Sequence, residues 1–336
     1  MRIFCNPQRQ RAHAPAVELH NGGFTPYAET PGRLDAILAA VGPTECPPDR
    51  GLAPILAVHD ADYVGFLQEA PTLWRQAGRS GDAIPYAFPI VGRRPLALSR
   101  VDALLGAHAF DATTPLASGT WGAAYASAQA ALAATHAVLQ DRDRAAFALC
   151  RPPGHHAGAD YCGGYCHLNH AAIAAQAARD AGIERVAILD IDYHHGNGTQ
   201  DIFWERGDVF YASIHADPAG DYPFYWGHAD ERGAGAGDGV SLNLPLPRGS
   251  TGEAFRRAQG AALEAIARFA PGLLVISFGA DTWQGDPISA FALRTEDYAL
   301  LARDIARCGW PSVIVMEGGY AVAALGTNVA SFLAGF

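Results

Sequence analysis

Short apolar runs recur from about residue 145 to the end of the chain, and segments of helical character alternate with them. These runs include Ala145–Leu149, Arg185–Leu189, Leu273–Phe278 and Val313–Met316. A strand that is apolar on both faces belongs in a parallel sheet that helices cover on both sides. We therefore predict a single α/β domain over residues 1–336, built on a mostly parallel sheet.

The remaining elements are predicted from helix caps and from the period of the apolar positions. Residues 1–28 lack a regular pattern. Residues 78–119 contain several prolines and show little periodicity, so we interpret them as a functional insertion rather than a plain connection. Further strands are expected at Ile55–His59, Val209–Ile214 and Val240–Leu244. Helices are expected at Thr30–Val41, from Asp60 to before Pro71, and at Thr120–Gln140, Asn169–Gly182, Thr251–Phe269, Thr295–Gly309 and the end of the chain.

The composition narrows the class of partner. Hydrophobic residues make up 49% of the 336 residues and charged residues only 17%, which is enough apolar material for a sizeable core. The formal net charge of −10 argues against a nucleic-acid partner, which needs a basic face, and favours a cationic small molecule. We see no apolar window long enough for a membrane span and no signal peptide at Met1–Cys5, so we expect a cytoplasmic protein.

The six cysteines give little chemical information. They are scattered and form no Cys-x-x-Cys pair. Cys162 and Cys166 share a Gly-rich loop and could hold a metal or form a disulfide, although isolated buried thiols are the simpler interpretation.

Acids and histidines follow the predicted strand at Arg185–Leu189. Residues i and i+2 of a strand point to the same face, so Asp192 and His194 project together from its carboxyl end. Asp190 lies on the same side, whereas His195 points to the opposite face. Carboxylate oxygen with imidazole nitrogen is a ligand set for zinc or a similar divalent metal, and strand ends of this kind bind ligands. The alternative is a strand end with solvated polar side chains.

Three more polar clusters come directly after predicted strands. His155 and His156 lie in a loop stiffened by proline and glycine, and tandem imidazoles suit acid–base catalysis, whereas a lone histidine is usually structural. Asp281 would give a third metal ligand and leave one position open. Tyr320, after two glycines, could donate its hydroxyl to an oxyanion or simply pack behind a turn. Together these clusters predict metal-assisted hydrolysis.

The order of these motifs resembles the zinc-dependent histone deacetylase superfamily over nearly the whole chain. The motifs are Arg151–Gly158, Gly163–Cys166, Ile188–Gly198, Gly279–Asp281 and Glu317–Tyr320. Within the superfamily, the chain is most similar to the bacterial acetylpolyamine amidohydrolases, as judged from Glu18-Leu19, Gly119–Trp121, Arg206–Phe210 and Met316–Tyr320. The resemblance implies an arginase–deacetylase fold with a central, mostly parallel sheet of about eight strands and helices on both faces.

The resemblance also implies residue roles. One zinc ion per subunit would be held by Asp192, His194 and Asp281. The implied catalytic residues are His155, His156 and Tyr320, with Asp190 and Asn197 as partners of the first and second histidine. Structural potassium would bind at Asp190, Asp192, His194, Ser213 and Ile214, and at a second site formed by Phe203, Arg206, Val209 and Val240. The implied substrate channel contains Gly164, Tyr165 and Tyr222.

The implied reaction is hydrolysis of N-acetyl amides of small polyamines, such as acetylputrescine and acetylcadaverine, to free amine and acetate. Asp190 is anionic and should keep His155 charged. Asn197 is neutral, so His156 should be the general base and later the acid that protonates the leaving amine. Zinc and the Tyr320 hydroxyl would together hold the oxyanion.

The substrate's cationic far end needs an acid. Glu18 and Asp102 are candidates, although both could be solvated surface carboxylates, and the family commonly has the longer Glu where this chain has Asp102. The insertion at about 78–119 is expected to help form a homodimer and to narrow the site. A narrow mouth would admit a thin, flexible polyamine and exclude a lysine on a folded protein.

Other functions use much of the same machinery. A protein or peptide acetyl-lysine deacetylase would differ only at the mouth, and hydrolysis of another amide, ester or xenobiotic is also open. A non-catalytic acetyl-amine binding protein is the alternative of another class, but both histidines and Tyr320 are present, which argues against it. Ureohydrolases need two metals and more ligands than these motifs offer.

Overall fold

A seven-stranded parallel sheet forms the centre of the computed structural model, which describes residues 1–90, 97–140 and 143–336. The strand order is β1-β4-β9-β8-β5-β6-β7, and every neighbouring pair is parallel. The strands are β1 (Arg2–Phe4), β4 (Ala145–Ala148), β5 (Val186–Asp190), β6 (Val209–Ala216), β7 (Ser241–Leu246), β8 (Leu273–Phe278) and β9 (Ser312–Met316). The predicted α/β class is confirmed, with seven strands where about eight were expected.

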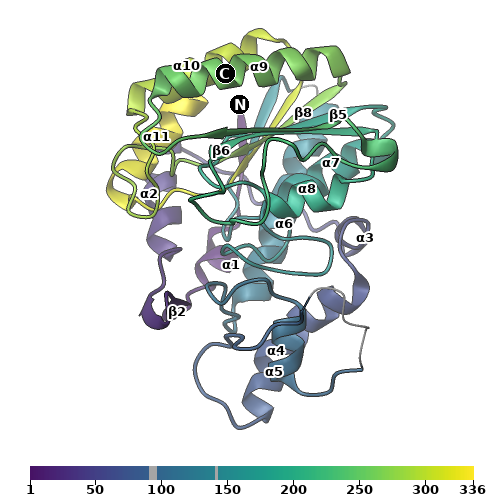
Figure 1. Ribbon diagram of the computed structural model, residues 1–336, viewed down its shortest axis with the longest axis vertical. Coiled ribbons are helices and arrows are strands. Elements are labelled where there is room, and N and C mark those ends of the chain that lie inside the picture. Colours follow the sequence, from purple (N-terminus) through teal and green to yellow (C-terminus); the bar gives the residue numbers. More distant parts are fainter. Residues whose placement is uncertain (91–96, 141–142) are drawn as a thin grey trace.

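Helices cover both faces of this sheet (Figure 1). The helices are α1 (Pro7–Arg11), α2 (Pro31–Val41), α3 (Ala53–Leu56), α4 (Ala61–Gln76), α5 (Val101–Ala107), α6 (Thr120–Leu139), α7 (His170–Asp180), α8 (Asn197–Phe203), α9 (Gly252–Phe269), α10 (Thr295–Arg307) and α11 (Val322–Leu333). Helices α9 and α10 lie above the sheet in Figure 1, and α6, α7 and α8 lie below it. In the described part of the chain, no helix combines the length and apolarity needed to cross a membrane.

Both faces of the central strands are buried because successive side chains point to opposite sides. On β5, Leu189 points to the face that α9 and α10 cover, whereas Ile188 points to the face that α6 and α7 cover. Each side chain packs into the hydrophobic cluster between the sheet and those helices. The second cluster is rich in alanine from α6 and α7, and such small side chains let the helices lie close to the sheet. This is why the apolar runs showed no alternation in the sequence.

The amino-terminal segment is more regular than predicted. β1 pairs with β4 at the sheet edge, and α1 follows it. A two-stranded antiparallel hairpin is formed by β2 (Val17–His20) and β3 (Gly23–Pro26). These elements were missed because they are short and their side chains show little periodicity.

Two predicted elements near residue 60 are wrong. Ile55–His59 is not a strand, because residues 53–56 form α3. Pro71 does not end the next helix, because α4 continues to Gln76. Leu73 and Trp74, beyond the proline, still pack against a separate hydrophobic cluster with residues of α4 and α5. We infer that this packing outweighs the lost backbone hydrogen bond.

Helix α5 lies inside the predicted insertion at residues 78–119. Positions 91–96 of the insertion are outside the described residues. The remainder packs at the end of the molecule that is lowest in Figure 1, next to α4.

Candidate metal centre and catalytic pocket

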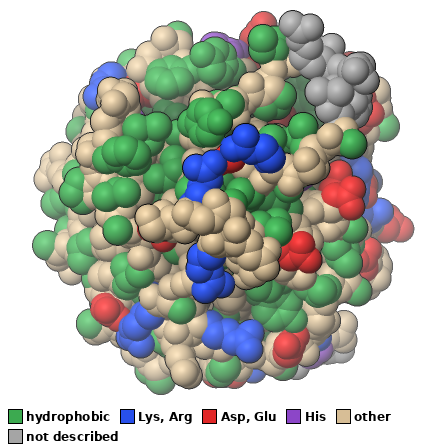
Figure 2. All heavy atoms as spheres, turned by 90° about the horizontal axis from the view of Figure 1, so that it is seen from below, with side chains coloured by type: hydrophobic (Ala, Val, Ile, Leu, Met, Phe, Trp, Pro, Cys, Tyr) green, Lys and Arg blue, Asp and Glu red, His purple; other side chains and the backbone are tan. Residues whose placement is uncertain are grey.

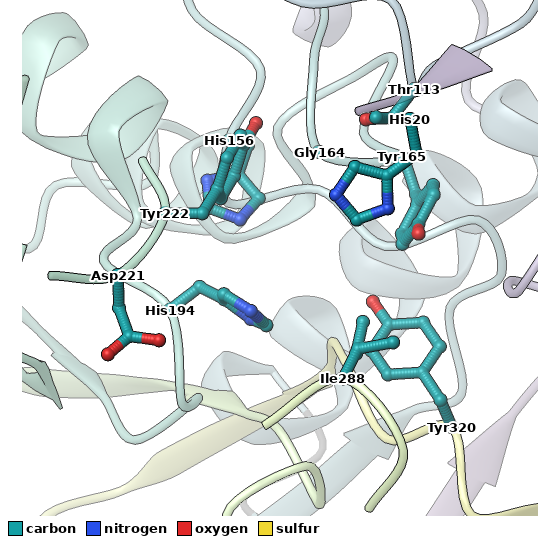
Figure 3. Close-up of a pocket in the computed structure, with 10 residues that line it drawn as sticks. All are labelled: His20, Thr113, His156, Gly164, Tyr165, His194, Asp221, Tyr222, Ile288 and Tyr320. Carbon is teal, nitrogen blue, oxygen red and sulfur yellow. The ribbon is translucent and has the colours of Figure 1, made fainter. Parts of the chain in front are cut away.

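A cavity of about 170 Å³ opens at the carboxyl ends of the central strands. Its lining residues are His20, Thr113, His156, Gly164, Tyr165, His194, Asp221, Tyr222, Ile288 and Tyr320. In Figure 3 the ring of His194 and the hydroxyl of Tyr320 point into the same space from two different segments. The cavity is too small for a folded domain but can hold an acetyl group and part of a methylene chain.

Three potential metal ligands converge at its floor. β5 leads into Asp192 and His194, and β8 leads into Asp281. One ligand atom from each side chain lies within 4.8 Å of the others. The Nδ1 atom of His194 is 3.3 Å from Asp192 Oδ1 and 3.2 Å from Asp281 Oδ2. Oxygen, nitrogen and oxygen donors in this arrangement fit a zinc ion with an open position.

The charges at this floor favour a bound cation. Burial and the nearby charge of Asp192 raise the pKa of Asp281 to about 7. Among the described residues, no group meets hydrogen-bond geometry at the buried Asp281 Oδ2 atom, although His194 Nδ1 lies 3.2 Å from it. Two buried carboxylates so close together are costly unless a cation compensates them. The predicted ligand set therefore fits a divalent metal on electrostatic grounds as well.

Two glycines make the space for these carboxylates. A Cβ atom at Gly279 would collide with the carboxylate of Asp192, and one at Gly318 would collide with the carboxylates of Asp192 and Asp281. The backbone N–H of Gly318 also donates to Asp192 Oδ2 at 2.8 Å. The glycine motifs after β8 and β9 thus allow the backbone to approach the metal ligands closely.

The tandem histidines have different partners. His155 Nδ1 lies 3.0 Å from Asp190 Oδ2, and His156 Nδ1 lies 2.7 Å from Asn197 Oδ1. Burial alone would lower the pKa of His155, but the charges of Asp190 and Asp192 outweigh it and raise the pKa to about 10. Burial and the neighbouring imidazoles hold the pKa of His156 well below its usual value. One imidazole is thus held charged and the other neutral.

Glu317 is a buried residue that sequence reasoning did not assign to the site. Its Oε2 atom accepts hydrogen bonds from the backbone N–H groups of Gly154, at 2.7 Å, and His155, at 3.1 Å. Its Oε1 atom accepts from Ser277. Glu317 therefore ties the histidine loop after β4 to strands β8 and β9.

Tyr320 is held from two sides. Asp286 accepts a hydrogen bond of 2.6 Å from the Tyr320 backbone N–H. The guanidinium of Arg33, on α2, lies over the Tyr320 ring and donates to the carbonyl oxygens of Glu317 and Gly319, each at 2.6 Å. Arg33 was also missed. The only signal was a charged residue on the otherwise apolar inner face of the predicted helix at 30–41.

Aromatic side chains and acids form the mouth. The Tyr165 hydroxyl donates to Glu18 at 3.1 Å, and Glu18 is buried on β2. The Tyr222 hydroxyl donates to Asp111 at 2.8 Å, and Asp111 also accepts from the Gly164 backbone N–H at 2.8 Å. Asp111 belongs to the insertion and joins both walls of the channel, but no motif identified it.

The other mouth candidate lies elsewhere. Asp102 is on α5 and forms ion pairs with Arg79, at 2.6 Å, and Arg100, at 2.8 Å. It is not among the residues that line the cavity. A shorter carboxylate that is already paired with two arginines is poorly suited to receive a substrate amine.

The remaining candidates have structural surroundings. His195 hydrogen bonds to Asn243 at 3.1 Å, on the side away from the cavity. All six cysteines are free. A ligand atom of Cys166 lies within 4.8 Å of ligand atoms of His155 and Glu317, but those two side chains already hydrogen bond to protein groups.

The residues expected to bind potassium fall into two groups. Asp190 and Ser213 are paired in register on β5 and β6, and Ile214 follows on the same strand. In the second group, Val209 begins β6, and Val240 directly precedes the neighbouring strand β7. The carbonyl of Phe203 accepts a hydrogen bond from the backbone N–H of Arg206 at 3.0 Å.

Comparisons with known proteins agree with these motifs. The family model of the histone deacetylase domain matches residues 27–336. The chain is 50% identical to acetylpolyamine amidohydrolase 1 of Pseudomonas aeruginosa, covering 97% of this chain and 96% of that protein. It is 44% identical to the acetylpolyamine amidohydrolase of Mycoplana ramosa, covering 100% and 99%. The crystal structure of acetylpolyamine aminohydrolase from Burkholderia pseudomallei matches with a TM-score of 0.95 and 44% identity, covering 100% of this chain and 98% of that chain.

Proposed function

The chain belongs to the histone deacetylase family, and on that premise we propose that it hydrolyses the N-acetyl amides of small polyamines to free amine and acetate. The observation that carries the proposal is the convergence of three buried metal-ligand side chains, a neutral imidazole and a tyrosine hydroxyl on one narrow cavity. The names of the full-length relatives support the polyamine as substrate.

Asp192, His194 and Asp281 are the proposed ligands of one zinc ion. A zinc ion held there would polarise the acetyl carbonyl and lower the pKa of a water molecule toward about 7. Their burial keeps bulk water from competing with the reacting groups.

His156 is the proposed general base and later the general acid. Its Nδ1 atom is engaged by the neutral amide oxygen of Asn197, which leaves Nε2 to accept a proton in the cavity. His155 faces the anionic Asp190 and stays charged, so it has no free site for a proton and acts electrostatically. As the C–N bond breaks, Nε2 of His156 gives this proton to the nitrogen of the leaving amine.

Tyr320 is the proposed oxyanion donor. Its backbone is fixed by Asp286, and its ring is held by Arg33. A hydroxyl held in place before the reaction loses little energy to reorganisation when charge develops on the substrate oxygen.

The mouth supports a cationic, chain-like substrate. Tyr165 and Tyr222 line the cavity and would sandwich the methylene chain. Glu18, hydrogen bonded to Tyr165, is the acid that we propose for the distal ammonium. Burial raises the pKa of Glu18, and a cation beside it would favour its charged form.

A rate panel on the purified, zinc-loaded protein tests this function. Substrates would be acetylputrescine, acetylcadaverine, N-acetylbutylamine, which lacks the distal amine, and an acetyl-lysine peptide. We expect the highest kcat/KM with the acetylated diamines. A clear preference for the peptide would instead identify a protein deacetylase. If none of the four substrates released acetate, a binding protein would be favoured.

We also propose a homodimer formed through the insertion. Figure 2 looks onto the end of the molecule that carries α4 and α5, where hydrophobic side chains surround a few arginines. Tyr86 and Ile90 of the insertion are 71% and 69% exposed. Large apolar side chains so exposed favour a protein contact. Sedimentation at several protein concentrations would test this, and a monomer at all of them would contradict it.

Structural potassium is a separate proposal. Site one would use Asp190, Asp192, His194, Ser213 and Ile214, and site two would use Phe203, Arg206, Val209 and Val240. The in-register pairing of Asp190 with Ser213 supports the first site. Melting temperatures in KCl and in tetramethylammonium chloride at equal ionic strength should differ, with KCl higher.

A further inference from the structure

The amide of Asn197 has a second anchor besides His156. Its Nδ2 atom lies 3.4 Å from the hydroxyl oxygen of Tyr161 and 3.5 Å from the carbonyl oxygen of His156. The Tyr161 hydroxyl in turn donates to Asp201 Oδ2 at 2.5 Å. A hydrogen-bonded chain thus runs from His156 through Asn197 and Tyr161 to Asp201.

The direction of this chain follows from the number of protons. A tyrosine hydroxyl has one hydrogen, and here it points to a carboxylate. The Tyr161 oxygen can therefore only accept from Asn197, which requires the NH₂ group of the amide on that side. The amide oxygen must then face His156 Nδ1, at 2.7 Å, so the proton of a neutral His156 sits on Nδ1.

We propose that Tyr161 is a positioning residue for the reaction, and that Asp201 orients its hydroxyl. Together they hold the Asn197 amide in the orientation that keeps the His156 lone pair on Nε2, the atom available to the cavity. Without the Tyr161 oxygen, only the 3.5 Å contact to the His156 carbonyl opposes a turn of the amide that presents N–H to Nδ1 and favours the opposite tautomer. That tautomer cannot accept a proton at Nε2.

The surroundings of Tyr161 are those of a residue at the periphery of the site, not of a residue in the hydrophobic core. Tyr161 is partly buried, Asp201 is exposed, and the Tyr161 ring packs edge-on against Phe110 at 5.6 Å. Removing only the Tyr161 hydroxyl therefore leaves the ring packing and the fold in place.

Steady-state kinetics of Tyr161→Phe on acetylputrescine test the inference. We expect kcat to fall about 10-fold, the lower end for such outer contacts, with KM unchanged because the substrate does not touch Tyr161. The matched control is Tyr125→Phe, which removes a hydroxyl that hydrogen bonds to Asp49, remote from the cavity. It should leave kcat unchanged.

A double-mutant cycle separates positioning from general support of the structure. If Tyr161 acts through Asn197, Tyr161→Phe has no further effect in an Asn197→Ala background. Equal fold-losses in both backgrounds would overturn the inference, as would wild-type kcat in the single variant. The inference rests on the proposed function, but the two fail differently: an inactive wild-type enzyme refutes the function, and an active wild type with an unaffected Tyr161→Phe refutes only the positioning role.

Discussion

The guanidinium of Arg33 lies over the ring of Tyr320, with the Arg33 Cζ atom 4.9 Å from the ring centroid. The same guanidinium is fully buried and paired with Glu29. It thereby links helix α2 to the turn that presents the tyrosine hydroxyl.

Arg33→Met should reduce both activity and stability. Glu29 keeps the Arg151 guanidinium at 3.0 Å but loses that of Arg33, and the Tyr320 turn loses two hydrogen bonds. We expect the free energy of unfolding to fall by about 3–5 kcal/mol, as for other broken buried ion pairs, and kcat to fall more than KM rises. Urea unfolding measures the first. The control Arg256→Met breaks an exposed pair with Asp304 and should cost about 1 kcal/mol or less.

Tyr320→Phe should remove the oxyanion donor alone. We expect kcat to fall by about 10²–10³-fold, with the fold and zinc content retained. Circular dichroism and metal analysis check the last two points. The control Tyr225→Phe changes a side chain that is 82% exposed. A wild-type kcat in Tyr320→Phe would rule out the assigned role.

Asn197→Asp should shift the pH profile. An anion beside His156 raises the imidazole's pKa, by about 1–3 units for a close opposite charge. Because the base must be neutral, the acidic limb of kcat/KM should move to higher pH. The matched control is Asn243→Asp, next to His195 outside the cavity, which should not move the limb. An unshifted limb in Asn197→Asp would exclude His156 as the base.

Metal removal should lower stability and abolish activity. A ligand that binds only the folded state stabilises it by about 4 kcal/mol at 1,000 times its Kd. We therefore expect chelation to lower the melting temperature and added zinc to restore it. In Asp281→Asn, zinc should give little recovery, whereas the control Asp304→Asn, on the outer face of α10, should respond as wild type. Full recovery in Asp281→Asn would contradict its role as a ligand.

Buried histidines, among them His59, His167 and His170, should make the fold sensitive to acid. Burial lowers the pKa of His59 to about 4 and those of His167 and His170 to about 3. In the unfolded chain their pKa is about 6.5, so the unfolded state binds more protons below that pH. The free energy of unfolding should be greatest above pH 6.5. At pH 5.5, one pH unit below the unfolded-state pKa, it should be lower by about 1.4 kcal/mol for each such histidine.

Urea unfolding at pH 7 and at pH 5.5 tests this pH dependence. His167→Leu should reduce the loss by the contribution of one histidine, about 1.4 kcal/mol. Both ring nitrogens of His167 lack hydrogen-bond partners among the described residues, so the substitution breaks no hydrogen bond. The exposed His136→Gln is the control and should keep the wild-type slope. An unchanged slope in His167→Leu would show that other groups cause the acid sensitivity.

The central strands were predictable because their burial leaves a strong pattern. Leu273–Phe278 matches β8 residue for residue, since a run of large apolar side chains this short fits a doubly covered strand. Ile55–His59 has a similar composition but forms a helical turn, because a few residues cannot distinguish a buried strand from a buried helix. There, tertiary packing decided the outcome.

The residues of the site also fall into those that the sequence predicted and those that it did not. Asp192, His194 and Asp281 follow strands whose ends meet at one edge, so topology alone predicted their convergence. Arg33 and Asp111 are single charged residues in segments without a motif. Their importance depends on contacts with residues about 50 to 290 positions away, such as Gly164, Tyr222 and Gly319, which no local pattern encodes.

The two glycines behind the metal ligands have a consequence for how this sequence can vary. Gly279 and Gly318 contribute no functional atoms from a side chain, yet a methyl group at either position would occupy the volume of a ligand carboxylate. In a saturation library scored for zinc uptake, both positions should tolerate as few substitutions as Asp192 or Asp281. The specificity of the metal centre thus depends partly on two residues that neither a chemical reagent nor a search for metal-ligand side chains would detect.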